Sequence, residues 1–495
     1  MKTPSNIICG AFALLATFGL LPPAQAIVPA PDGGYPGGNT AEGQSALFSL
    51  TTGVYNTAVG YFSLRTDAQG QFNTAVGAAA LLLNVGDPST GDGILNTAIG
   101  AGALLSNTTG SLNTANGAFA LFSNTTGMAN AATGRYALFS NTIGEENTAS
   151  GTSALYSNTM GFRNTADGRL ALYSNTTGGA NSAAGCRSLF SNTTGNYNTA
   201  HGYLALTSNT TSDSNTAVGS FSLTGNTTGF GNTAIGAAAL LSNMTADENV
   251  AIGANALSNN TNGSTNVAIG TGAGGNITSA NNVVCVGYSA GGVHQTGDTD
   301  VYLANPGLDG ESGTVRIGTG DGVHTRMFLA GVRDTTTGHP NAIPVVIDSS
   351  GQLGTISSSR RFKHDVESMD KASEAILALK PVTFHYKSDR TNTSQFGLIA
   401  EDVAEVNQDL IVRDEKGEIY TVRYDAVNAM LLNEFLKEHR KVEALQTGLA
   451  QQQTDFQAAI AQQQKQIDAL GATLQKVSAQ RLLNKPAPQT VLNNQ

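Results

Sequence analysis

The sequence predicts a mainly β protein: a parallel β-solenoid (β-roll) of fifteen 17-residue repeats, a short β-stalk, a small α+β unit and a C-terminal coiled-coil helix. Three observations carry this prediction. A repeat fills residues 39–299, charged residues become abundant only after Arg360, and apolar residues recur at coiled-coil spacing over 431–482. With 58 Gly, 13% charged residues and no Trp in 495 residues, the composition suits stacked small units better than one globular core.

Net charge and cysteine usage exclude several classes of protein. The formal net charge of -10 argues against nucleic acid as a partner, since such proteins carry a basic footprint. Cys9, Cys186 and Cys285 are too few and too scattered for a zinc site or a disulfide framework. No motif for a metal or a cofactor occurs, so we expect neither.

Residues 1–26 have the layout of a secretory signal peptide. Lys2 is followed by an apolar stretch from Ile7 to Leu21 and by Ala24-Gln25-Ala26, after which cleavage is expected. The alternative is an uncleaved membrane anchor, but the apolar stretch is short for a span. No transmembrane anchor is apparent further along the chain. We therefore expect an exported product, extracellular or at the cell surface, with residues 27–38 as a linker.

The repeat has the consensus N-T-A-x-G-x-x-A-L-x-S-N-T-T-G-x-x, and its positions are numbered 1 to 17 from that Asn. The small residue at position 3 predicts an interior column, and Leu at position 9 predicts an apolar seam along the stack. Gly at position 5 indicates a backbone with positive φ or a close approach. We expect two strands per turn, N-T-T-G at the opposite corner, and buried Asn side chains that bond from turn to turn.

Position 4 is apolar at both ends of the array and polar or small in the middle, from Asn116 to His201. Such a column faces either a neighbouring chain or solvent, and we favour a seam between three chains. The Thr residues at positions 13 and 14 leave open an ice-binding or surface-binding array.

These repeats resemble the β-roll head repeats of trimeric autotransporter adhesins, through the pattern N-[TV]-A-[IV]-G-x-x-A over residues 39–299. The resemblance implies three chains side by side, each contributing a left-handed roll. It also implies an adhesin-like surface protein with a surface or glycan as a further partner.

Residues 300–356 form a connector of short apolar runs separated by Gly and Pro, which we interpret as a β-stalk interwoven among three chains. In the unit that follows, 357–430, the pattern predicts a helix over Asp370–Leu379 and a strand over Val382–Tyr386. It then predicts a strand and helix over Phe396–Val406 and a hairpin turning at Lys416-Gly417.

This unit resembles the C-terminal intramolecular chaperone of phage endosialidase tailspikes over about 357–445. The matching stretches are S-x-x-R-x-K at Ser358–Lys363, L-x-P-V-x-F at Leu379–Phe384, G-L-I-A-E-D-V at Gly397–Val403 and V-x-Y-D at Val422–Asp425. The resemblance implies a domain that drives trimer assembly and then cuts itself off. In that scheme Ser358 is the nucleophile, Lys363 is the base and Ser357–Ser358 is the scissile bond. Ser359 stands where the family often has Asp.

The chemistry of such a pair can be argued from the residues. A Ser hydroxyl needs an adjacent base, and a neutral Lys can serve if burial or nearby positive charge lowers its pKa. Arg360 and Arg361 offer that charge, and trimer assembly could offer the burial. The alternative is a solvated linker, which would leave an uncleaved fibre with a C-terminal trimerisation domain. His364 and His385 lack ligand spacing.

Residues 431–482 carry apolar residues at coiled-coil spacing with one four-residue step, while Gln452 and Gln463 occupy core positions. We expect residues 483–495 to be a disordered tail. The apolar core positions are Leu431, Phe435, Val442, Leu445, Leu449, Phe456, Ile460, Ile467, Leu470, Leu474 and Val477.

Overall fold

The computed structural model describes residues 35–319, 323–324, 326–329, 332, 341–348, 350–414 and 416–484. The chain divides into two units, one ending at Phe328 and the other beginning at Leu329, and each is described by itself. The expected signal peptide, most of the linker 27–38 and most of the tail 483–495 lie outside the described residues.

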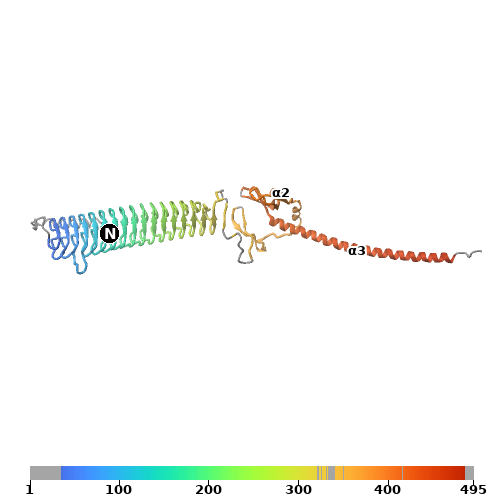
Figure 1. Ribbon diagram of the computed structural model, residues 1–495, viewed down its shortest axis with the longest axis horizontal. Coiled ribbons are helices and arrows are strands. Elements are labelled where there is room, and N and C mark those ends of the chain that lie inside the picture. The colour runs from blue at the N-terminus through green and yellow to red at the C-terminus, as the bar shows by residue number, and fades with distance from the viewer. Residues whose placement is uncertain are drawn as a thin grey trace, which may run out of the picture. The chain divides into compact units, whose positions relative to one another are not determined.

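The first unit is a parallel β-solenoid, as the sequence predicted (Figure 1). Each turn contributes one three-residue strand, and every strand pairs in parallel with the strand of the next turn, as in the register Ala132↔Ala149. The strands of this single 17-stranded sheet are β1 Thr40–Glu42, β2 Thr57–Val59, β3 Thr74–Val76, β4 Thr97–Ile99, β5 Thr114–Asn116, β6 Ala131–Thr133, β7 Thr148–Ser150, β8 Thr165–Asp167, β9 Ser182–Ala184, β10 Thr199–His201, β11 Thr216–Val218, β12 Thr233–Ile235, β13 Val250–Ile252, β14 Val267–Ile269, β15 Val284–Val286, β16 Val301–Leu303 and β17 Val315–Ile317.

The interior of the coil is built from two columns of apolar residues. Position 3 is Ala from β1 to β14, and these side chains are buried. Leu at position 9 packs against them, and Leu64 through Leu257 are fully buried. Each strand lies between the strands of the preceding and the following turn, 17 residues away in the sequence. The interior beside position 3 therefore holds little more than a methyl group, and the larger Leu side chain at position 9 fills the remaining space.

The expectation of two strands per turn was wrong, because outside the single strand each turn is irregular. Leu at position 9 explains the difference, since it adopts φ near +50° throughout, as at Leu121 and Leu138. This left-handed conformation is incompatible with a strand. It is held by burial of the side chain and by the backbone, where Leu121 N–H donates to the Ala137 carbonyl at 2.9 Å.

Gly at position 5 has the predicted positive φ and lies close to the next turn. At Gly134, φ is +127° and a Cβ would lie 2.7 Å from the Gly151 carbonyl oxygen. Any larger residue would therefore meet both a strained backbone and a neighbouring turn.

Buried Asn side chains form two ladders along the solenoid, as the sequence predicted. At position 1, the side-chain oxygen accepts from the backbone N–H of the Asn one turn later, as from Asn147 to Asn130 at 3.0 Å. At position 12, each Nδ2 donates to the Oδ1 of the preceding turn at 2.7–3.1 Å, from the Asn107–Asn84 pair to the Asn260–Asn243 pair. We call the second set the position-12 ladder. It satisfies polar groups that burial would otherwise leave without partners.

Two other columns face outward. Position 4 is exposed in most strands, and Val218, Ile235 and Ile269 there are 37–40% exposed. At position 13 the Thr hydroxyls are used within the stack, since Thr125 Oγ1 donates to the Thr142 carbonyl of the next turn at 3.0 Å. This bond occupies the hydroxyl hydrogen that a free Thr array would present to a ligand.

The stack accommodates one insertion and continues past the last consensus repeat. The longer step between Asn73 and Asn96 is taken up by a loop in which Asp87 pairs with Asp92, and the sheet keeps its register there. β16 and β17 add two strands inside the segment that the sequence analysis assigned to the connector. Among the described residues both Cys186 and Cys285 are free thiols.

The second unit contains three short antiparallel hairpins and a long helix. Its core gathers Val403, Ala404, Leu410, Ile411, Val422 and Met430. The elements are β18 Val346–Ile347, β19 Leu353–Gly354, the 3₁₀ helix η1 Arg360–Phe362, the 3₁₀ helix η2 Asp370–Ala378, β20 Val382–Phe384, β21 Gln395–Gly397, α2 Ala400–Val406, the 3₁₀ helix η3 Gln408–Leu410, β22 Ile411–Arg413, β23 Ile419–Val422 and α3 Tyr424–Leu483.

These elements follow the order read from the sequence, with η2 a 3₁₀ helix where an ordinary helix was expected. α3 is 60 residues long and carries its apolar coiled-coil positions on the surface, with Leu445 and Phe456 each 72% exposed. Over the described residues, no helix combines the length and the apolar character needed to cross a bilayer.

Candidate functional site

The segment that carries Ser358 and Lys363 is folded by one tight turn. Phe362 N–H donates to the Ser359 carbonyl and Lys363 N–H donates to the Arg360 carbonyl, each at 3.1 Å. These bonds close η1 and fold the chain back on itself between the two candidate residues. A spacing of five residues is therefore short enough for the two side chains to meet.

Lys363 Nζ lies 3.2 Å from Ser358 Oγ and donates a hydrogen bond to it. Both residues are exposed in the single chain. The distance is within reach of a proton transfer between nucleophile and base. The exposed position leaves the Lys363 amine open to solvent.

The residues around this contact are also exposed. Ser357 Oγ accepts from Ser359 N–H at 3.4 Å, which ties together the two sides of the expected cleavage point. The Arg361 guanidinium lies over the Phe362 ring at 4.6 Å. His364 lies 2.8 Å from Asp365, and both side chains are exposed at the surface.

A second Ser–Lys contact joins η2 to α3. No sequence pattern predicts it, because its members are 64 residues apart. Lys437 Nζ lies 3.2 Å from Ser373 Oγ and 2.7 Å from Glu434 Oε1. Ser373 also donates to Glu434 and accepts from Asn433 Nδ2.

This second contact is unsuited to nucleophilic chemistry. Ser373 is fully buried, so no peptide carbonyl can approach its hydroxyl. Lys437 Nζ is taken up by the Glu434 carboxylate at 2.7 Å, and this hydrogen bond lowers the pKa of Glu434. The cluster therefore fastens η2 to the first part of α3.

Most other motif residues in this unit build the fold. A Cβ at Gly397 would lie 2.8 Å from the Tyr424 hydroxyl, which accepts a hydrogen bond from Leu398 N–H at 3.0 Å. Val403 and Val422 are buried in the core. Between β20 and β21, Thr391 and Thr393 donate to Asp389 and lower its pKa to about 2. Among the described residues, no group of His, Cys, Asp and Glu is placed to hold a metal ion.

Residues 358–412 match the family model Peptidase_S74, described as the chaperone of endosialidase. The match begins at Ser358 and follows the β-solenoid, in agreement with the resemblance read from the sequence. Searches of curated proteins and of solved structures gave no significant match.

Proposed function

We propose that this chain is an exported, trimeric, adhesin-like fibre whose C-terminal chaperone domain assembles the β-solenoid and then releases itself by cleaving the Ser357–Ser358 bond. The observation that carries the proposal is the 3.2 Å contact between Lys363 Nζ and Ser358 Oγ at the first residue of the family match.

The proposed reaction uses groups within one short segment. Lys363, as the neutral amine, takes the proton of the Ser358 hydroxyl while Oγ attacks the Ser357 carbonyl carbon. The C–N bond then breaks and the amine of Ser358 takes a proton from Lys363, which leaves an ester. Water hydrolyses this ester, giving a carboxylate on Ser357 and restoring the Ser358 hydroxyl. One turnover suffices, so a modest catalyst is adequate.

Assembly would control this step. In the single chain Lys363 is exposed. A lysine amine can act as a base only in its neutral form. Neighbouring copies that covered the segment would remove water from the amine and favour its neutral form. Cleavage would then follow assembly.

Self-association is supported by apolar surface on the second unit. The coiled-coil positions of α3 are exposed in the single chain, and a 60-residue helix with such a seam gains stability by joining others. Phe396 and Tyr420, on β21 and β23, are 81% and 74% exposed. Aromatic side chains this exposed favour a contact with further copies. On the solenoid, the exposed position-4 column remains our candidate for the seam.

The test is electrophoresis and N-terminal sequencing of the full chain, expressed with its N-terminal segment. Wild type should give a C-terminal fragment that begins at Ser358. Ser358→Ala and Lys363→Ala should remain full length, because each removes one half of the dyad. Ser359→Ala is the matched control and should be cut like wild type.

Two results would contradict the proposal. Cleavage of both Ser358→Ala and Lys363→Ala at the wild-type rate would exclude the dyad. An uncut wild-type trimer would favour the alternative of a permanent C-terminal trimerisation domain.

A further inference from the structure

The strands at the C-terminal end of the solenoid differ from all earlier strands on their outer side. In β13 to β17 the residue at position 2 is Val and the residue at position 4 is Ile, Val or Leu, whereas β1 to β12 carry Thr, Ser or Ala at position 2. We call these aliphatic residues the β13–β17 face. They are Val250, Ile252, Val267, Ile269, Val284, Val286, Val301, Leu303, Val315 and Ile317.

The side chains of the β13–β17 face form two straight columns along the stack. The strands pair in parallel, so Val267 lies beside Val284 and Ile269 lies beside Val286, and the same register continues to β17. Alternate residues of a strand point to opposite sides, so positions 2 and 4 share the side opposite to position 3. Val286 is 37% exposed and Val315 is 65% exposed, so the face is uncovered in the single chain.

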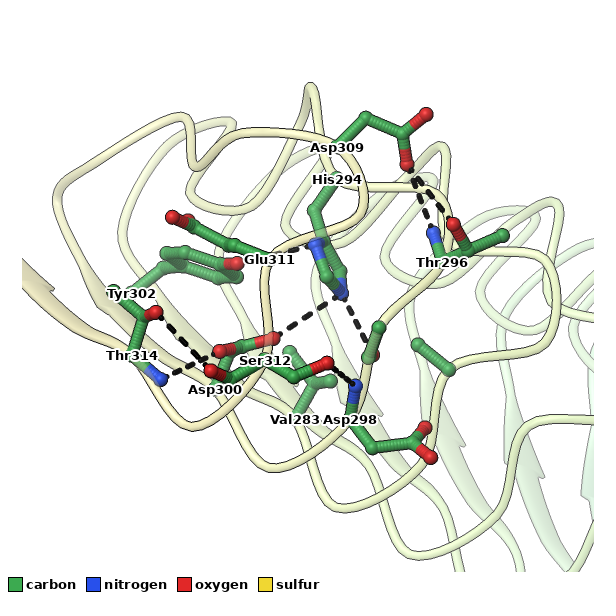
Figure 2. A network of polar contacts seen from close by, with 12 residues as sticks. Val283, His294, Thr296, Asp298, Asp300, Tyr302, Asp309, Glu311, Ser312 and Thr314 are labelled. Atoms are coloured by element: carbon green, nitrogen blue, oxygen red, sulfur yellow. Dashed lines mark hydrogen bonds and ion pairs between the residues drawn. The ribbon is translucent and has the colours of Figure 1, made fainter.

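The inner side of the same turns is filled by the chain itself (Figure 2). Tyr302, the middle residue of β16, is fully buried, and its hydroxyl lies 3.1 Å from His294 Nδ1. Asp300 precedes β16, and its Oδ2 lies 3.7 Å from His294 Nε2 with both side chains buried. Val301 and Leu303 flank Tyr302 and therefore face away from this interior. Only the outer side of β16 is open to a partner.

An apolar column that runs along the stack is suited to a second copy of this chain. In a cyclic assembly whose axis is parallel to the solenoid, each residue meets its own equivalents at the same height. Aliphatic residues that recur at one position of the repeat then meet aliphatic residues on every copy. The coiled-coil seam of α3 also favours identical chains, and helices joined through it would bring several solenoids together.

The middle turns are unsuited to the same contact. Position 4 is Thr133 in β6, Asp167 in β8 and His201 in β10. Asp167 is exposed and has no ion pair within the part of the chain that the structure describes. Close approach of the copies there would place identical carboxylates beside one another, and such like-charge contacts are unfavourable. The strands β2 to β4, β11 and β12 have Thr at position 2 and present one aliphatic column instead of two.

We propose that copies of this chain join solenoid to solenoid through the β13–β17 face and stand apart at β6 to β10. This inference rests on the proposed self-association and names the part of the position-4 column that carries it, together with a second column at position 2. The face comes last among the turns of the solenoid, directly before the connector and the chaperone domain in the chain. The copies would therefore meet first at the turns closest in sequence to the domain proposed to assemble them.

The test is disulfide cross-linking of the full chain after its own thiols have been removed by Cys9→Ala, Cys186→Ser and Cys285→Ala. One cysteine is then introduced at a time: Ile269→Cys on the β13–β17 face, or Thr133→Cys as the matched control at an exposed position 4 in the middle. A disulfide needs Cα atoms within about 7 Å of each other. On mild oxidation, Ile269→Cys should give covalent pairs of chains at least about tenfold faster than Thr133→Cys, as seen by non-reducing electrophoresis.

Sedimentation of the same samples separates the two possible failures. In associated chains, equal rates for the two variants, faster linking of Thr133→Cys or no linking of Ile269→Cys would overturn the inference and leave the self-association standing. A background variant that sediments as a single chain would overturn both. Val286→Cys, on the next strand of the face, repeats the test if Ile269→Cys does not fold.

Discussion

Asp67 occupies the turn of the position-12 column just before the Asn ladder begins at Asn84. It is fully buried, and its carboxylate accepts from Gly70 N–H at 2.8 Å and from Asn73 Nδ2 at 3.1 Å. In the position-12 ladder every amide NH₂ group points toward the preceding turn. The Asp67 carboxylate, one turn before Asn84, therefore lies at the end of the ladder toward which the donors point. Burial outweighs these hydrogen bonds, and the pKa of Asp67 is raised above its ordinary value.

The raised pKa of Asp67 predicts that the free energy of unfolding depends on pH. Between the ordinary value and the raised value, the folded chain holds a proton that the unfolded chain has lost, so stability falls as the pH rises through that window. Asp67→Asn should therefore raise the melting temperature by a few degrees at pH 7, with the difference shrinking toward pH 4. Asp167→Asn makes the same charge change at an exposed strand position and is the control. A stabilisation equal in both variants would point to net charge instead of burial.

The solenoid and α3 differ in how their rows of apolar side chains are covered. In the middle of the solenoid, aromatic residues at position 10 stack from turn to turn with ring centroids 5.1–5.2 Å apart, among them Phe139, Tyr156 and Tyr173. Neighbouring turns bury these rings within one chain. The apolar seam of α3 has no such neighbours among the described residues, and in the proposed trimer other copies would cover it.

The seam can be tested with charged substitutions. Leu445→Arg/Leu449→Arg places two charges on the apolar seam and should convert the proposed trimer to monomer, measured by sedimentation. It should also prevent cleavage at Ser358, because Lys363 then remains exposed. Ala450→Arg, on the same helix but off the seam, should leave both unchanged. Full cleavage in the monomeric variant would separate the reaction from assembly.

Across the whole solenoid, each turn is stabilised by its two neighbours and all columns repeat every 17 residues. Deletion of residues 147–163 removes one turn and joins Glu146 to Asn164 in register. We expect this variant to fold and to melt within a few degrees of wild type, as followed by circular dichroism.

The matched control removes one residue more. Deletion of residues 147–164 also takes Asn164 out of the position-1 ladder and leaves a turn that is too short. An extra residue can loop out, as at Asp87–Asp92, but a missing one cannot be supplied. The longer deletion should therefore melt at a clearly lower temperature, and equal melting of the two variants would contradict the role of register.

Much of the fold could be predicted because the same local environment recurs in every repeat. The interior Ala, the buried Asn and the turning Gly were each identified from residue type and period. The single strand per turn was missed because Leu normally avoids a left-handed backbone, and here burial overrides that preference. In the second unit, the order of helices and strands followed from Pro381, the Lys416-Gly417 turn and the apolar pattern.

The sequence by itself determined the solenoid, the order of its columns and the two residues proposed for cleavage, since these depend on neighbours that are close in the chain or one period away. Only the tertiary structure decided which ionisable residues meet: Ser373 with Glu434 and Lys437, and His294 with Asp300. Neither meeting follows from a repeat or a motif. Each contact depends on how the backbone brings segments together that are far apart in the sequence. A buried charge at such a contact is stable only beside a partner of opposite charge.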